Sequence, residues 1–165
     1  MVRAFQSLID SGQDAVLLLA GPTRYTHLAW LAQLGLRDHV RFVGRTARLA
    51  ELAAAADLVV QPTERDPAGW GIRPALQTAT PIITTTACDL SGVVRQRGGT
   101  VLNSPVAPAQ LLLALRERLQ SLPESDGEAP ETLRPTPDSG VPTLFEAVGT
   151  LIACRGSLAF PSHIP

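Results

Sequence analysis

Short apolar runs alternate with amphipathic stretches along the first 120 residues of the chain. Short apolar or β-branched runs that predict strands occupy residues 15–20, 40–43, 58–60, 82–85 and 100–102, with Arg41 as the one charged residue among them. The run at 15–20 is continuous and apolar, as expected of a strand buried on both faces. Apolar positions at helical spacing occupy residues 4–9, 28–34, 49–56, 75–78, 90–97 and 108–119. This alternation predicts an α/β fold with a parallel sheet and helices on both faces.

The pattern changes after residue 121. Residues 122–142 are rich in Pro, Ser and acidic residues, which predicts a disordered linker. Residues 143–154 are apolar enough for one short helix, followed by a tail to residue 165. The sequence therefore predicts one domain over residues 1–121, a linker over 122–142 and a short apolar helix and tail over 143–165.

Composition excludes several function classes. With 165 residues the chain has room for one ordinary domain. Its net charge of -1 shows no excess of basic residues of the kind that nucleic-acid-binding proteins carry. All fourteen basic residues are Arg, which excludes Schiff-base chemistry and phosphate-loop NTPases, because both need a lysine. No apolar run is long enough to span a bilayer, and no signal peptide is evident, so we expect a cytoplasmic protein with at most peripheral membrane contact.

Metal and thiol chemistry are also disfavoured. Cys88 and Cys154 lie far apart and match no metal-binding or redox spacing, and three scattered histidines complete no ligand set. We therefore expect no metal and no bound cofactor. Cys88 follows a predicted strand on the side where ligands bind, but a structural thiol is the favoured interpretation.

The best candidate site is the loop after the run at 58–60, because open parallel sheets bind ligands at the carboxyl ends of their strands. Gly69, Trp70 and Gly71 allow the backbone to approach a ligand closely, and a helix beginning there offers N–H groups to a phosphate. Asp66 is placed to accept hydrogen bonds from sugar hydroxyls, and Arg73 adds a cation. The alternative is a solvated turn with a helix cap.

Five segments in this order carry a resemblance to a known family. They are 17–21 (LLLAG), 34–44 (LGLRDHVRFVG), 56–62 (ADLVVQP), 66–71 (DPAGWG) and 80–85 (TPIITT). In order and spacing the chain resembles the C-terminal domain of a retaining glycosyltransferase of family 4. The resemblance covers roughly residues 4–120, and the chain closely resembles enzymes that add sugars to lipopolysaccharide or other cell-envelope glycans.

The resemblance implies a GT-B fold, in which two Rossmann-like domains face a cleft and the C-terminal domain holds the sugar nucleotide. This chain corresponds to that half. By position, Asp66 matches the family's acid at the donor sugar, and the Gly69–Gly71 turn matches its phosphate-binding turn. Gly44 and Arg45 fall where the family's backbone meets the nucleotide base, although for Arg45 a solvated loop residue is an equal alternative. The family commonly works without a bound metal.

Two departures from the family pattern bear on activity. The family's second acid, which holds the ribose, falls on Pro74, which has neither a carboxylate nor an N–H. The family's domain also opens with a strand, a Gly-Arg turn and a lysine, whereas Met1 falls inside the helix that follows. We expect no catalytic residue in this chain, and Arg73 to replace the missing cations in part.

Three hypotheses follow. The first is a glycosyltransferase that transfers a sugar from a nucleotide-sugar donor to a glycan or lipid-linked acceptor, and that needs a missing N-terminal half or a partner chain. The second is a non-catalytic Rossmann-like binding module with a decayed donor site, favoured by Pro74 and by Gly92 where the family often has an acid. The third is an inactive fragment, marginally folded because a parallel sheet without one edge strand exposes apolar surface.

Overall fold

The computed structural model describes residues 1–21, 25–44, 48–66, 68–122 and 150–154. Its elements in chain order are α1 (Val2–Asp10), β1 (Val16–Ala20), α2 (Tyr25–Gln33), β2 (Val40–Gly44), α3 (Leu49–Ala54), β3 (Leu58–Gln61), η1 (Ala75–Gln77), β4 (Ile82–Thr85), α4 (Ser91–Gln96), β5 (Thr100–Leu102), α5 (Pro108–Gln120) and β6 (Thr150–Cys154). The alternation of strands and helices predicted for residues 1–121 is confirmed.

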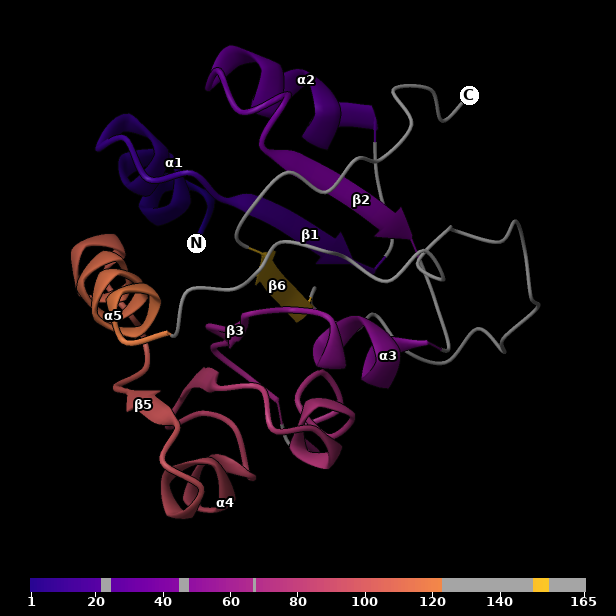
Figure 1. Ribbon diagram of the computed structural model, residues 1–165, viewed down its shortest axis with the longest axis vertical. Coiled ribbons are helices and arrows are strands. Elements are labelled where there is room, and N and C mark those ends of the chain that lie inside the picture. The colour runs from indigo at the N-terminus through magenta and orange to yellow at the C-terminus, as the bar shows by residue number, and fades with distance from the viewer. Residues whose placement is uncertain (22–24, 45–47, 67, 123–149, 155–165) are drawn as a thin grey trace.

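The six strands form one sheet in the order β2-β1-β6-β3-β4-β5. β1 pairs with β2 in parallel, and β3, β4 and β5 pair in parallel with one another. β6 lies between β1 and β3 and runs antiparallel to both (Figure 1). The sheet thus consists of a β1–β2 half and a β3–β5 half, with β6 between them.

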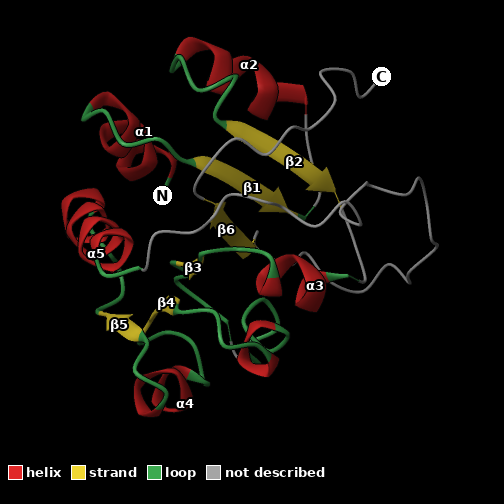
Figure 2. Ribbon diagram, in the orientation of Figure 1, coloured by secondary structure: helices red, strands yellow, loops and turns green. Residues whose placement is uncertain are grey.

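Helices cover both faces of the sheet, as the sequence predicts (Figure 2). On one face α1 and α5 lie side by side, and Phe5 and Leu115 pack there with Leu17 of β1 and Leu58 of β3. On the other face α3, η1 and α4 pack against Leu18 and Val59 of the same strands, through Leu52, Ala75 and Val94. Successive strand residues thus enter opposite cores, which explains why the strands read as continuous apolar runs.

The predicted C-terminal helix is wrong for residues 150–154, which form β6 in the middle of the sheet. The run Thr150–Cys154 is short and apolar, and periodicity alone does not separate a helix from a buried strand in a run of this length. The unpaired edges of two buried strands, β1 and β3, determine the outcome. β1 and β3 therefore have no open edge towards each other, because β6 pairs with both strands. The fragment hypothesis stays a hypothesis.

The other C-terminal predictions lie outside the described residues. Apart from Leu122, the structure does not describe the predicted linker, nor residues 143–149 and 155–165. Among the helices that are described, none has the length and apolar character needed to cross a membrane.

Candidate functional site

The loops that follow β3 and β4 lie side by side at the carboxyl edge of the sheet. The backbone N–H of Asp66 donates to the carbonyl of Ala87 at 3.3 Å, and the N–H of Asp89 donates to the carbonyl of Asp66 at 3.3 Å. An isolated parallel bridge joins Asp66 to Cys88. The sequence-predicted loop is thus anchored to its neighbour through the backbone of Asp66.

Asp66 is buried, with 7% of its surface exposed, and both of its carboxylate oxygens have partners. Oδ2 accepts a hydrogen bond from Nε2 of Gln61 at 2.9 Å, and Oδ1 accepts one from the backbone N–H of Trp70 at 3.2 Å. The carboxylate therefore links the end of β3 to the first residues of the Gly-rich turn. Its contact with a donor sugar stays a prediction.

The turn at Gly69 has a geometry that requires glycine. Gly69 has φ +61°, and a Cβ built on it would lie 2.4 Å from Cδ1 of Leu90. Its carbonyl accepts the backbone N–H of Arg73 at 2.8 Å, which closes one helical turn. Positive φ and close approach are the two properties for which glycine is needed, so this residue sets the path of the chain into η1. Gly71, the other glycine of the turn, is buried.

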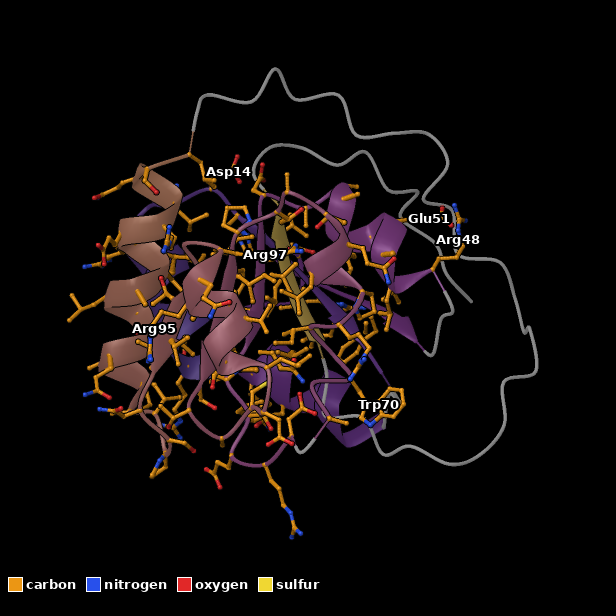
Figure 3. All side chains as sticks on the ribbon, turned by 90° about the horizontal axis from the view of Figure 1, so that it is seen from below. Asp14, Arg48, Glu51, Trp70, Arg95 and Arg97 are labelled. Carbon is orange, nitrogen blue, oxygen red and sulfur yellow. The ribbon has the colours of Figure 1, made fainter. Side chains whose placement is uncertain are left out.

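Trp70 and Arg73 are the exposed side chains of this turn. Trp70 is 49% exposed and points away from the body of the molecule (Figure 3). The Arg73 guanidinium lies over its ring, 5.8 Å from the centroid, and donates to the carbonyl of Ala68 at 3.1 Å. A cation and an aromatic surface are therefore presented together next to the Gly-rich turn.

Pro74 adopts helical angles, φ -63° and ψ -39°, at the start of η1. Proline is tolerated there because it needs no intrahelical N–H partner at a first helical position. The family's second acid has no equivalent at this position, as the sequence indicates.

Gly44 stands at the same edge of the sheet but in the other half. It ends β2 with φ +66°, and its carbonyl accepts the backbone N–H of Gly21 at 2.8 Å, which ties the ends of β1 and β2 together. β1 and β6 separate β2 from β3, so Gly44 and Gln61 are about 14 Å apart across three strand spacings. Arg45 lies outside the described residues.

A buried polar network at the ends of β3 and β4 was not predicted from the sequence. Oγ1 of Thr85 donates to the carbonyl of Thr63 at 2.5 Å, and Oγ1 of Thr84 donates to the carbonyl of Gln61 at 3.2 Å. Within the described part of the chain, Oε1 of Gln61 is buried without a hydrogen-bond partner. The sequence carried one signal for this network: Gln61, a polar residue, ends an apolar strand directly before Pro62.

Cys88 contacts this network. Its Sγ lies 3.8 Å from Oδ2 of Asp66, and burial raises the pKa of the thiol, with the Asp66 carboxylate contributing in the same direction. A raised pKa keeps the thiol protonated, which agrees with the structural thiol expected from the sequence. Among the described residues, no group of three or more His, Cys, Asp or Glu side chains is arranged to hold a metal ion.

A cleft of about 430 Å³ lies at the opposite edge of the sheet. Pro81, before β4, and Gly98, before β5, line it together with Arg97 and Arg118. The Arg118 guanidinium donates to Oγ1 of Thr100 at 2.8 Å and to the carbonyl of Gly98 at 2.5 Å. Ligands of open parallel sheets bind at the carboxyl ends of the strands, so we place the candidate site at the Asp66–Arg73 loop and not in this cleft.

Comparison with known proteins identifies relatives for most of the chain. The family model of the glycosyl transferases group 1 matches residues 1–121. The lipopolysaccharide glucosyltransferase WaaG of Escherichia coli K12 is 30% identical over 125 residues, which cover 74% of this chain and 33% of WaaG. The chain thus spans about a third of the length of this curated relative.

Solved structures agree with this assignment. The crystal structure of WaaG, a glycosyltransferase involved in lipopolysaccharide biosynthesis, matches with a TM-score of 0.59 and 30% identity, over 64% of this chain and 29% of that one. Anabaena HepE, solved in complex with UDP and glucose, shares the fold with a TM-score of 0.50 and 20% identity, over 63% of this chain and 30% of that one. The chain therefore belongs to the glycosyl transferases group 1 family, with a Rossmann-like GT-B domain over residues 1–121.

Proposed function

We propose that this chain is the nucleotide-sugar-binding part of a glycosyltransferase that delivers a sugar to a glycan or lipid-linked acceptor. Transfer, with retention of configuration, would require further sequence or a partner chain. The observation that carries the proposal is the family match over residues 1–121, in a chain whose Asp66–Arg73 loop lies at the carboxyl edge of the sheet. HepE, which shares the fold, was solved with UDP and glucose.

The turn supplies groups suited to the diphosphate and sugar of such a donor. Gly69 and Gly71 are proposed for close approach of the backbone to the ligand. The N–H groups of Gly69, Trp70 and Arg73 already donate within the loop, so the helix N-terminus expected from the sequence does not present them to a phosphate. The Arg73 guanidinium, with five N–H donors, is therefore proposed for the charge-assisted hydrogen bonds to a phosphate. The half-exposed Trp70 ring offers an apolar surface to a sugar or a base. Asp66 is our proposal for contact with the donor sugar, and its hydrogen bond to Trp70 also holds the turn in place.

The leaving diphosphate accumulates negative charge as the glycosidic bond breaks, so a fixed cation near it lowers the barrier. Arg73 is our proposal for that cation. Gly44 and Arg45, after β2, are proposed for the nucleotide base. No metal cofactor is part of the proposal.

Calorimetric titration of the purified chain with UDP-glucose, then with a panel of other nucleotide sugars, tests the proposal. We expect saturable binding, and we expect Arg73→Ala to weaken it about 10- to 100-fold, because a charge-assisted hydrogen bond contributes about 1.5–3 kcal/mol. Arg95→Ala is the matched control, since Arg95 is an exposed arginine of α4 on the far side of the molecule from Trp70 (Figure 3). Equal affinity of the Arg73 and Arg95 variants would contradict the role of Arg73.

Pro74 favours a second candidate, a non-catalytic Rossmann-like module whose donor site has decayed. A proline offers no carboxylate to the ribose, and it stands where the family has an acid. The same titration separates the two candidates once circular dichroism has shown that the chain is folded. A folded chain that binds no nucleotide sugar in the millimolar range favours the non-catalytic module.

A further inference from the structure

The middle of the sheet depends on a single strand with the opposite direction to its neighbours. β6 pairs with β1 from Val16↔Cys154 to Ala20↔Thr150, and with β3 from Leu58↔Ala153 to Val60↔Leu151. In the described sheet β1 and β3 do not pair with each other. Without β6, the described strands of the β1–β2 half and of the β3–β5 half would share no backbone hydrogen bonds.

We call the space between β1 and β3 that β6 occupies the slot. Backbone groups left unpaired on either side of the slot would be buried among apolar residues. Leu17 and Leu18 of β1 are each 1% exposed, and Leu58, Val59 and Val60 of β3 are 0% exposed. Backbone N–H and C=O groups left unpaired among such residues would each carry the full cost of desolvation. The two strands therefore form a site that binds an extended segment through its backbone.

The occupant comes from outside the part of the chain that matches the family. The match ends at residue 121 and α5 ends at Gln120, whereas β6 begins at Thr150. Both walls of the slot thus belong to the family domain, and the strand that fills it does not. The run Thr-Leu-Ile-Ala-Cys carries no charge and no proline, as a strand paired on both sides requires.

We propose that the slot between β1 and β3 is a strand-binding site and that residues 150–154 are its intramolecular ligand. The segment docks as a donor strand, by the backbone pairing that lets a peptide add to an exposed sheet edge, but here it pairs on both of its sides. Its central register position is Ile152, which stands opposite Leu18 in one ladder and Val59 in the other.

Hydrogen exchange of the full chain, read by mass spectrometry, tests the proposal. Ile152→Pro removes a ladder N–H at the central position, whereas Ile152→Val keeps both the N–H and the β propensity. In the proline variant we expect the backbone amides of β1 and β3 to exchange about 100-fold faster or more, with the valine variant close to the parent chain. Unchanged protection of β1 and β3 in the proline variant would overturn the proposal.

A peptide added in trans keeps the test decisive even if the proline variant unfolds. A synthetic peptide of residues 149–155, titrated to millimolar concentration into the Ile152→Pro chain under reducing conditions, should restore protection at β1 and β3 saturably. The same peptide carrying Ile152→Pro should not. Failure of the parent peptide to restore protection, or equal rescue by both peptides, would show that the slot is not a strand-binding site.

The slot also affects the candidate site, a consequence that rests on the proposed function. Gly44 belongs to the β1–β2 half and the Asp66–Arg73 loop to the β3–β5 half, so β6 sets their separation. Ile152→Pro should therefore weaken UDP-glucose binding, and the parent peptide should restore it. The exchange experiment contains no nucleotide, so a parent chain that binds no UDP-glucose would contradict the proposed function while leaving the strand-binding site supported or overturned by its own result.

Discussion

The two halves of the sheet hold their carboxyl edges by different means. In the β3–β5 half, buried polar side chains bond to one another and to the backbone; they are Gln61, Thr63, Asp66, Thr84 and Thr85. In the β1–β2 half, the described contact at the corresponding edge is a backbone hydrogen bond between Gly21 and Gly44, and most residues of β2 are only partly buried. The side-chain network fixes the ends of β3 and β4 to one another at the carboxyl edge of the β3–β5 half.

The largest difference between the halves should appear on removal of a carboxylate. Asp66→Ala leaves Nε2 of Gln61 and the N–H of Trp70 without their acceptors, and we expect a loss of about 3–4 kcal/mol in the free energy of unfolding. Asp14→Ala removes an exposed carboxylate just before β1, at the opposite end of the strands from Trp70 (Figure 3), and should change stability by less than about 0.5 kcal/mol.

Urea unfolding of the two variants measures this difference. If Asp66→Ala proves no more destabilising than Asp14→Ala, the buried network does not stabilise the β3–β5 half, and the comparison between the halves fails.

Alanine substitutions at two glycines, one in each half, should differ by a smaller amount in the free energy of unfolding. Gly69 and Gly44 have nearly the same backbone angle, φ +61° and +66°, but a Cβ on Gly69 would collide with Leu90, whereas a Cβ on Gly44 would meet no atom of the described residues within 4 Å. Gly44→Ala should cost about 1 kcal/mol from backbone strain alone. Gly69→Ala should cost about 2–3 kcal/mol, because overpacking adds to the strain.

Chemical denaturation of both glycine variants, together with Gly69→Ala/Leu90→Ala, separates the two contributions. The double variant should show positive coupling, with Gly69→Ala costing less in the Leu90→Ala background. Additive effects would mean that the Leu90 side chain moves aside without cost.

The smallest effect concerns the reactivity of Cys88. Burial raises its pKa, so at neutral pH even less of it is thiolate than in an ordinary cysteine, and alkylation by iodoacetamide should be slow. Because the Asp66 carboxylate also raises this pKa, Asp66→Asn should move the pH dependence of alkylation towards lower pH. Mass-spectrometric rates at the Cys88 peptide across pH 7–10 check this, and an unchanged profile in Asp66→Asn would show that the carboxylate does not act on the thiol.

The order of elements in residues 1–121 and the place of the candidate loop at the carboxyl edge of the sheet were predictable from sequence because both depend on local patterns. Leu17 and Leu18 face opposite cores, and a strand buried on both faces has to be apolar throughout. The Gly69–Gly71 turn followed an apolar strand, which in a parallel sheet places it at the ligand-binding edge. The family assignment rests on the same local segments, and the comparisons confirm it.

The partners of Asp66 and the conformation of residues 150–154 were decided by tertiary structure. Nothing local to Asp66 indicates that Cys88 will lie beside it, because β4 brings that residue there from 22 positions away. The segment Thr150–Cys154 is equally compatible with a helix or a strand, and pairing with β1 and β3 selects the strand. As a helix, a five-residue run leaves nearly all of its backbone N–H and C=O groups without intrahelical partners. As a strand between β1 and β3 it pairs on both sides, and that pairing is available only once the rest of the sheet has formed.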